Sequence, residues 1–216
     1  MVVGKRMKRE PVTIRPEDSL RHAMNLVKEK RVRHLPVVDD KGRLVGVVSD
    51  RDIRAAWASS ATSLEVRELH YLLEKVKIEE IMTKKVITVS PNTTIEDAAL
   101  LMHDNRIGCL PVVEDDRLLG LITETDIFAA FVEVMGLGTE SSRIEVVMED
   151  RPGMLAAVAE IIRDQGFNIA SVAGYRHEDP RKVVNVFRVK VPRPESLVAA
   201  LKRAGFEVLS VIPPVE

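Results

Sequence analysis

Cysteine is almost absent from this sequence, which contains one such residue, Cys109, in 216. A single cysteine excludes an internal disulfide framework and a thiolate zinc site built within one chain. Long apolar runs are lacking as well, because no stretch approaches the roughly 18–20 residues that span a bilayer, and the first residues carry no apolar run of signal-peptide length. We therefore predict a cytoplasmic protein with no membrane association.

The sequence also lacks an excess of either charge, since its formal net charge is −1. Phosphate-backbone binding usually leaves a basic excess, so nucleic acid is not expected as the main partner. Motifs of common enzymes are absent too: we find no G-x-S-x-G elbow, no Walker A loop, no G-x-G-x-x-G, no C-x-x-C and no metal-binding histidine cluster. We predict no catalytic residue, no metal and no catalytic cofactor, and an enzyme of unrecognised type stays an alternative.

With 45% hydrophobic and 30% charged residues, the chain has enough apolar side chains to form buried hydrophobic cores. The length favours two units, and the first of them is an internal repeat. At an offset of 75 residues, the first copy recurs at Thr13 and Thr88, Pro16 and Pro91, Ala23 and Ala98, and Leu35-Pro36-Val37-Val38 and Leu110-Pro111-Val112-Val113. One residue is then lost in a polar turn, and Gly46 to Ile53 returns as Gly120 to Ile127.

Each copy is predicted to form a strand, a helix, a β-hairpin and a second helix. In the first copy an apolar stripe with helical spacing follows Pro16, and Leu35 to Val38 and Leu44 to Val48 are short β-rich runs around an Asp-Gly turn. The bridge from Arg54 to Met82 carries leucines at three- and four-residue spacing, which predicts a helix between the copies.

The duplicated [ST]-x-x-D motif lies between a strand and a helix, at Ser49 and Asp52 and again at Thr123 and Asp126. An ionised aspartate accepts two hydrogen bonds, which suits the vicinal hydroxyls of a ribose, and N–H groups at the helix start suit a phosphate. The same pattern is a helix capping box, which explains it without a ligand. Both interpretations stay open on the spacing alone.

Residues 7–130 resemble the tandem cystathionine β-synthase (CBS) repeat, or Bateman module, through four features that occur twice: the Met7 and Met82 starts, T-h-x-P, h-P-V-V and G-h-h-[ST]-x-x-D-h, where h is apolar. The resemblance implies that adenosine compounds bind in clefts between the repeats and that the motif aspartate takes the ribose. The nucleotide-binding residues that it implies are Thr13, Ile14, Pro16, Arg33, His34, Ser49, Asp52, Thr88, Val89, Pro91, Thr123 and Asp126.

The two clefts are expected to differ. The resemblance places the basic residues Arg33 and His34 against phosphate, but Gly108 and Cys109 stand at the equivalent positions of the second repeat. Ile14 and Val89 would cover the adenine face. The alternatives without a ligand are core strand for these two and a solvated loop for the basic pair.

A second unit follows a polar, Gly-containing linker at residues 136–142, whose Gly136 is expected to cap the preceding helix. Strands are predicted at Ile144 to Met148, Ile169 to Ala173, Val183 to Val191 and Glu207 to Ile212; helices are predicted from Gly153 to Gly166 and from Pro194 to Ala204. This βαββαβ order is the ferredoxin-like plan, with one sheet face left uncovered.

Residues 143–216 resemble an ACT domain through the run D-R-P-G-M-L in a βαββαβ frame, followed by G-F-N-I. The resemblance implies amino-acid binding, with a tentative site at Asp150, Arg151, Pro152, Gly153, Met154, Leu155, Asn168 and Ile169. A ligand carboxylate could meet free N–H groups at the helix start beside Gly153. The alternative is a simple helix start in a domain that only dimerises.

The order CBS, CBS, ACT resembles the acetoin-utilisation B protein family. We predict an α/β (α+β) fold with a CBS pair at residues 1–135 (repeat one about 7–56, repeat two about 82–135), a linker at 136–142 and an ACT-like domain at 143–216. The predicted function is a homodimeric, non-catalytic regulatory sensor. It binds an adenine nucleotide, with an amino acid as a second candidate ligand at the ACT domain. It controls a metabolic pathway, of the acetoin-utilisation type, through a partner protein. The alternative is a structural dimerisation module with decayed ligand sites.

Overall fold

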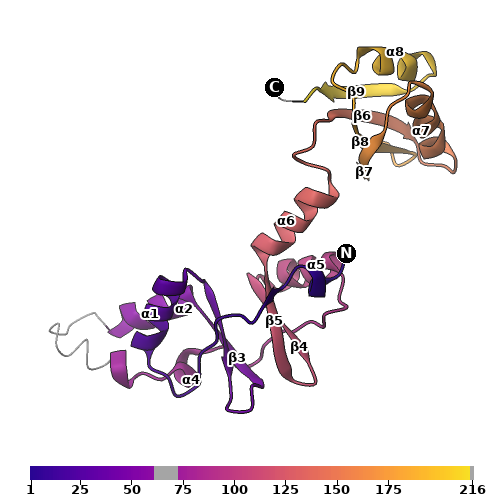
Figure 1. Ribbon diagram of the computed structural model, residues 1–216. Helices are drawn as coiled ribbons and strands as arrows, with labels where there is room; N and C mark the ends of the chain where they lie inside the picture. The colour runs from indigo at the N-terminus through magenta and orange to yellow at the C-terminus, as the bar shows by residue number, and fades with distance from the viewer. Residues whose placement is uncertain (61–72, 215–216) are drawn as a thin grey trace. The chain divides into compact units, whose positions relative to one another are not determined.

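The computed structural model describes residues 1–60 and 73–214. The chain divides into two compact units, Met1–Phe128 and Ala129–Glu216, and the division falls inside helix α6 (Glu124–Val134) (Figure 1). Among the described residues, no helix combines the length and the apolarity that crossing a membrane requires.

The first unit contains the two repeats. A short segment with η1 (Val3–Lys5) and β1 (Lys8–Arg9) precedes repeat one, which consists of α1 (Leu20–Lys30), β2 (His34–Val38), β3 (Leu44–Ser49) and α2 (Asp50–Ser60). Repeat two consists of α5 (Ile95–Asn105), β4 (Cys109–Glu114), β5 (Arg117–Thr123) and α6, and the short helix α4 (Ile78–Ile81) precedes it. The predicted order of helix, hairpin and helix is observed in both copies. Residues 61–72 of the predicted bridging helix lie outside the described residues.

The same local signals build the first helix of each copy. The side chain of Ser19 accepts a hydrogen bond from the backbone N–H of His22 at the start of α1, and Thr94 accepts one from Asp97 at the start of α5. Both helices end at an arginine in the left-handed conformation, Arg31 and Arg106, with φ of 52° and 53°. The repeated sequence therefore repeats its caps as well as its apolar stripe.

The two hairpins differ at the turn, where the sequence loses one residue. In repeat one, Asp39 accepts hydrogen bonds from the backbone N–H groups of Lys41 and Arg43, and Gly42 has a φ of 75°. In repeat two, Asp115 and Asp116 both have positive φ, which is the backbone of a two-residue type I′ turn. The strands themselves keep equivalent irregularities, at Val37/Val38 and at Val112/Val113.

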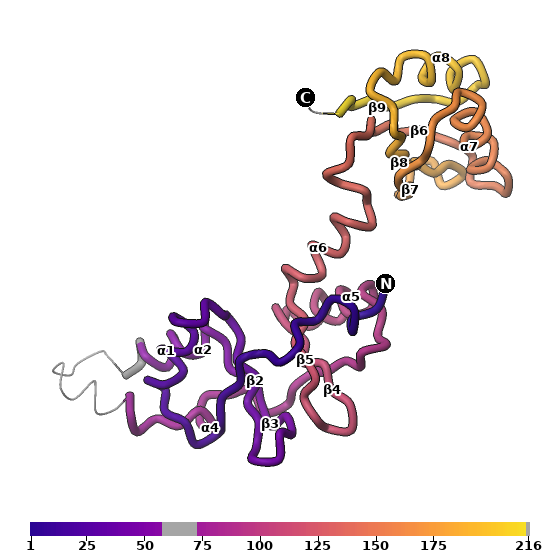
Figure 2. The backbone as a smooth tube through the Cα atoms, viewed as in Figure 1, coloured from indigo at the N-terminus to yellow at the C-terminus, as the bar shows by residue number. Residues whose placement is uncertain are grey.

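The repeats exchange their leading segments. Lys8 pairs with Leu121 of repeat two, whereas Thr83, which leads into repeat two, pairs with Val47 of repeat one. Figure 2 shows the N-terminal segment passing from the neighbourhood of α5 to repeat one. Each crossing passes over a glycine of the G-h-h-[ST] motif. A Cβ at Gly46 would lie 2.5 Å from the sulfur of Met82, and one at Gly120 would lie 2.7 Å from the sulfur of Met7.

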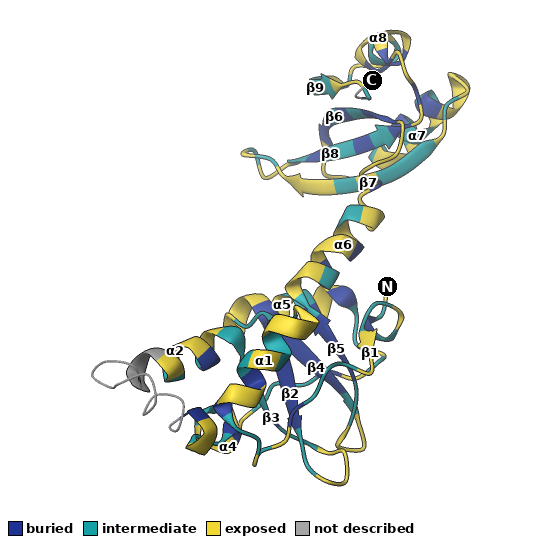
Figure 3. Cartoon of the chain, turned by 60° about the vertical axis from the view of Figure 1, so that its left-hand side comes forward, coloured by how far each residue is buried: buried dark blue, intermediate teal, exposed yellow. Residues whose placement is uncertain are grey.

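Each repeat has its own buried core, and both cores lie along the hairpins and the helices that pack on them (Figure 3). Ile14 and Val89 belong to these cores, with exposures of 2% and 6%. Their backbones pair in parallel with Val37 and Val112. The predicted first strand of each repeat is therefore reduced to a single buried β-bridge residue.

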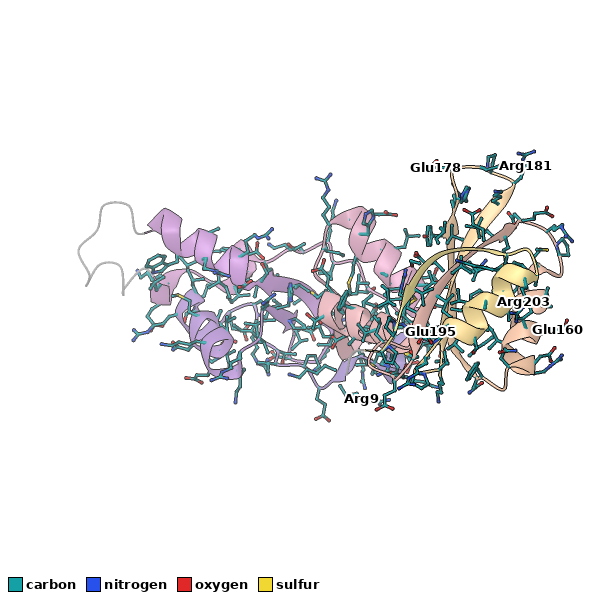
Figure 4. The ribbon with its side chains drawn as sticks, turned by 90° about the horizontal axis from the view of Figure 1, so that it is seen from above. Arg9, Glu160, Glu178, Arg181, Glu195 and Arg203 are labelled. Carbon is teal, nitrogen blue, oxygen red and sulfur yellow. The ribbon has the colours of Figure 1, made fainter. Side chains whose placement is uncertain are left out.

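The second unit has the predicted ferredoxin-like topology. Its elements are β6 (Ser142–Glu149), α7 (Met154–Asp164), β7 (Ile169–Arg176), β8 (Lys182–Val189), α8 (Glu195–Arg203) and β9 (Glu207–Ile212). The antiparallel sheet has the order β7-β8-β6-β9. Val158 and Ile162 of α7 and Leu197 of α8 pack in one core with Phe187 of the sheet, so both helices cover the same face. Figure 4 labels Glu178 and Arg181 in the turn between β7 and β8.

Candidate functional site

A cavity of about 990 Å³ lies between the two repeats of the first unit. Most of its wall comes from the β2–β3 end and α2 of repeat one, from the crossing segment that leads into repeat two, and from the α5–β4 connection. Its lining residues are Arg33, His34, Val47, Ser49, Asp50, Arg51, Asp52, Arg54, Thr83, Lys85, Val86, Ile87, Arg106, Ile107, Gly108, Cys109, Pro111 and Glu124. The volume is in the range of pockets that enclose a small organic molecule.

The motif aspartate in this cavity, Asp52, caps helix α2 through one of its two oxygens. The backbone N–H and the hydroxyl of Ser49 donate to Oδ2 of Asp52 at 2.8 and 2.6 Å, and the backbone N–H of Asp52 donates to the Ser49 hydroxyl at 3.2 Å. Oδ1 receives no hydrogen bond from the described part of the chain. The capping box is thus formed, and it leaves an acceptor for a ligand.

The second motif has the same geometry but a different setting. Thr123 donates to Oδ2 of Asp126 from its backbone and its hydroxyl at 2.9 and 2.6 Å. Neither residue lines the cavity. The two motifs are therefore equivalent as caps, and only the first borders the cavity.

His34 lies across from Gly108 near the middle of the cavity. A Cβ at Gly108 would lie 3.3 Å from both Cε1 and Nε2 of the imidazole and 3.5 Å from a carboxylate oxygen of Glu124. Burial lowers the pKa of His34, although the Asp50 and Glu124 carboxylates act in the opposite direction. The absence of a side chain at Gly108 makes room for the ring.

Cys109 is a buried thiol in this wall. Burial raises its pKa to about 12, and the nearby Glu124 carboxylate adds to that shift. Because the thiolate is the reactive form, Cys109 is inert as a nucleophile near neutral pH.

The cavity is rich in cations, most of which have no cationic counterpart at the equivalent position of the other repeat. Five cations, Arg33, Arg51, Arg54, Lys85 and Arg106, and three carboxylates, Asp50, Asp52 and Glu124, line it. The cations correspond in the repeat alignment to Gly108, Thr125, Phe128, Glu10 and Arg31, in that order. Four of the five positions lose the positive charge, so the clefts differ far beyond the Arg33–His34 pair that the sequence singled out.

The structure brings together four of the residues predicted for nucleotide binding, Arg33, His34, Ser49 and Asp52. It places the others outside the cavity: Thr13, Ile14, Pro16, Thr88, Val89, Pro91, Thr123 and Asp126. Apolar cover comes instead from Val86 and Ile87, two residues and one residue before Thr88. Sequence reasoning missed them, and also Lys85 and Arg51, because a repeat alignment does not show that the leading segments cross between repeats.

A second, smaller cavity of about 440 Å³ lies between α1 and α2 of repeat one. Met24, Val27, Ile53 and Trp57 give it a mainly apolar wall, and Asp50 and Arg54, which form an ion pair, border both cavities. Trp57 is 40% exposed there.

The loop predicted to bind an amino acid is an open turn before α7. Gly153 is the N-cap of this helix in the left-handed conformation, with a φ of 90°, and no side chain caps the helix. Arg151 pairs with Glu149, and Met154 packs on the core, whereas Leu155 is 49% exposed. The remaining predicted positions, Asp150, Pro152, Asn168 and Ile169, line neither of the two cavities described above.

The uncovered face of the second sheet carries a polar centre. Glu145 accepts hydrogen bonds from Arg143 at 2.6 Å, from the Ser210 hydroxyl at 2.5 Å and from the Tyr175 hydroxyl at 3.1 Å. The hydrogen bond from Arg143, followed by that from Ser210, lowers the pKa of Glu145 to about 2. Exposed apolar side chains on this face stand on the outer strands, at Tyr175 and Ile212.

No group of three His, Cys, Asp or Glu residues within residues 1–60 and 73–214 is placed to hold a metal ion.

Comparison with known proteins follows the same division of the chain. The family model of the CBS domain matches residues 3–59 and 78–133, more than half of the chain, and that of the ACT domain matches residues 142–206. The inosine-5′-monophosphate dehydrogenase of Methanocaldococcus jannaschii is 32% identical over 120 residues, which are 55% of this chain and 21% of that enzyme. The chain thus spans about a fifth of the length of that curated relative.

Many solved structures resemble the chain, including the following three. A candidate acetoin utilization protein (AcuB) from Vibrio cholerae is 33% identical and covers 63% of this chain and 94% of its own, with a TM-score of 0.54. The CBS domain pair of MJ0100, in complex with 5′-methylthioadenosine and S-adenosyl-L-methionine, is 31% identical and covers 61% and 95%, with a TM-score of 0.53. CBSX2 of Arabidopsis thaliana, in complex with AMP, is 32% identical and covers 62% and 97%, with a TM-score of 0.53.

Proposed function

This chain belongs to the CBS-domain family and carries an ACT domain after the CBS pair, and we propose that it is a non-catalytic regulatory sensor of an adenine nucleotide. The nucleotide binds in the 990 Å³ cavity between the repeats. Its binding biases the arrangement of a homodimer and so controls a partner protein. This coupling requires the nucleotide to prefer one arrangement of the two subunits over the other.

The observation that carries the proposal is the arrangement of Ser49 and Asp52. One carboxylate oxygen of Asp52 caps α2, while the other stays open in a cavity that also contains apolar cover from Val86 and Ile87. Ribose hydroxyls fit the open oxygen, and a base fits against the apolar side chains. Two relatives with CBS pairs were solved with adenosine compounds, AMP in one and S-adenosyl-L-methionine with 5′-methylthioadenosine in the other.

The experiment is calorimetry with AMP, ADP, ATP and S-adenosyl-L-methionine, with a matched pair of variants. Asp52→Ala removes the cap and the ribose acceptor, and Asp126→Ala removes an equivalent cap outside the cavity. We expect Asp52→Ala to weaken binding by about 1.5–3 kcal/mol, the range for hydrogen bonds to a charged group. Asp126→Ala should leave the affinity of this cavity close to that of the wild type. If none of the four ligands gives a binding signal at millimolar concentration, the proposal is wrong. If both variants bind with the affinity of the wild type, the two aspartates act only as helix caps.

An amino acid is proposed as a second ligand, at the loop before α7. Gly153 and the uncapped helix start leave backbone N–H groups to meet a carboxylate, and the ACT family match supports this assignment. A thermal-shift screen of amino acids tests it, because a ligand at 100 times its Kd adds about 2.7 kcal/mol of stability. If no amino acid raises the unfolding temperature, the domain serves only for dimerisation.

The homodimer is proposed from exposed apolar side chains on the helices of the first unit. Phe128 is 70% exposed, Leu100 59% and Trp57 40%, and apolar helix faces of this kind normally find a partner. A two-fold axis lets one surface serve both chains. Sedimentation of the full chain and of residues 1–135 tests the contribution of each half. We expect a dimer that the truncation weakens without loss of nucleotide binding, and a monomer of 24.1 kDa at micromolar concentration contradicts it.

The pathway under control is proposed to resemble acetoin utilisation, on the likeness to the Vibrio cholerae protein. A regulatory role fits a chain that matches about a fifth of a dehydrogenase and carries a Cys109 thiol inert near neutral pH. Growth of a deletion strain on acetoin tests this assignment, and unchanged growth contradicts it.

A further inference from the structure

His34 lines the cavity as an imidazole, and repeat two has no histidine at the equivalent position. Its equivalent by the repeat alignment is Cys109, and Gly108 opposite provides the space for its ring. In the β2–β3 ladder, His34 stands directly across from Ser49, whose hydroxyl bonds to Asp52. The imidazole and the proposed ribose acceptor, Asp52, therefore line the same cavity.

The charges around His34 come from three directions. Asp50 and Asp52 approach from α2, Glu124 from the start of α6, and Arg33 from the preceding residue. Of the five cations in the cavity, Arg54 is already paired with Asp50. Burial lowers the pKa of His34 and so favours the neutral ring, whereas a bound anion raises that pKa and favours the charged ring.

We propose that His34 senses the phosphate of the ligand: it takes up a proton from solution when a phosphate-bearing nucleotide binds and stays neutral when the ligand has no phosphate. This inference rests on the proposed nucleotide binding and assigns the residue that distinguishes a nucleotide from a nucleoside. Burial, which lowers the pKa of His34 in the free protein, supports it because the ring then has a proton to gain. A bound phosphate dianion stabilises the imidazolium by charge and by a hydrogen bond.

Gly108 is a positioning residue in this scheme. A methyl group there would press on Cε1 and Nε2 of His34 at 3.3 Å, closer than an ordinary contact. Gly108→Ala should move the ring and reduce its response to phosphate, while the ribose acceptor on Asp52 stays in place.

The test is calorimetry at pH 7.5 in three buffers of different ionisation enthalpy, with AMP and with adenosine as probes. The slope of the observed enthalpy against the ionisation enthalpy counts the protons taken up. At this pH the phosphate of AMP is already a dianion, since its second pKa is about 6, so its own titration contributes little. We expect a fraction of a proton taken up with AMP, none with adenosine, and none with AMP in His34→Gln. The matched control His103→Gln changes an 85% exposed imidazole on α5 and should behave as the wild type.

Affinity gives a second readout. The AMP affinity of the wild type relative to His34→Gln should rise roughly three- to tenfold from pH 8 to pH 6, because proton uptake is linked to binding. Binding of AMP with no proton uptake, or uptake that persists in His34→Gln, overturns the inference and leaves nucleotide binding standing. Absence of binding by both AMP and adenosine overturns the proposed function and this inference together.

Discussion

The two repeats of the first unit have nearly the same backbone and very different cavity walls. Both helices α1 and α5 begin at a hydroxyl cap and end at a left-handed arginine, and both motif aspartates form the same capping box. Only the repeat-one motif borders the cavity, and four of the five cations that line it have uncharged or acidic counterparts at the equivalent positions of the other repeat. Fold depends on the positions that the duplication kept, whereas ligand recognition depends on those that changed.

The largest effect we predict concerns whether the two repeats unfold together. Leu35 and Leu110 are equivalent and fully buried, so Leu35→Ala and Leu110→Ala should each lower the free energy of unfolding by about 2–5 kcal/mol. Because the leading segments cross between repeats, both variants should shift the same urea transition. The single tryptophan, Trp57 of repeat one, reports that transition by fluorescence. A Leu110→Ala variant whose Trp57 transition is unshifted would show that the repeats are independent.

The next prediction separates the two crossings. A Cβ at either glycine would meet a flexible methionine side chain, but one at Gly120 would also meet the backbone oxygen of Lys8 at 2.9 Å, whereas the nearest backbone oxygen to one at Gly46 is that of Thr83, at 3.2 Å. We expect Gly120→Ala to destabilise the first unit by about 1–3 kcal/mol and Gly46→Ala by less, because a thioether moves more easily than a backbone. Urea unfolding of both variants measures the difference. Met82→Ala in the Gly46→Ala background should restore stability if the contact with sulfur is the cause.

Most of the fold could be predicted from the sequence because its signals are local. The hairpin turns, the caps at Ser19 and Thr94, and Gly136 after α6, with a φ of 65°, are read from adjacent residues. The βαββαβ order of the second unit has a single common sheet topology, and the structure has it. The exchange of leading segments could not be predicted, since each segment satisfies the same pairing pattern in either repeat.

The candidate site was predicted only in part, for the same reason. Ser49 and Asp52 follow from the motif within one repeat, Arg33 and His34 follow from the family resemblance, and all four line the cavity. Ile14 and Val89 also followed from the motif, but their strands pair inward and leave them buried. The polar centre around Glu145 was missed because alternation along a strand indicates a face and does not indicate what the face contacts.

A smaller effect should follow from exchanging one charge between the repeats. Lys85 lines the cavity, and its equivalent in the alignment is Glu10. Lys85→Glu should weaken AMP binding by about 1 kcal/mol and leave adenosine binding nearly unchanged, because an exposed cation acts on the phosphate at long range. Calorimetry at two salt concentrations checks this, since a charge effect shrinks as salt rises. The matched control Glu10→Lys should change AMP affinity less, and an equal gain there would mean that both clefts take phosphate.

The smallest predicted effect is the pH dependence that His34 gives to the stability of the ligand-free protein. Burial lowers the pKa of His34 below its ordinary 6.5, so the unfolded chain binds more protons than the folded one as the pH falls through this range. The contribution of the neutral ring to the free energy of unfolding is therefore complete above about pH 6.5 and decreases as the pH falls below it. Urea unfolding between pH 7.5 and pH 5.5 should show this loss in the wild type and in His103→Gln, and a flatter profile in His34→Gln. Saturating AMP should reverse the sign of the difference, because the protonated ring then contacts a phosphate. If the stability profiles of the wild type and His34→Gln are parallel both with and without AMP, the ring stays neutral throughout this pH range. The difference between the two repeats would then depend on the arginines and Lys85 alone.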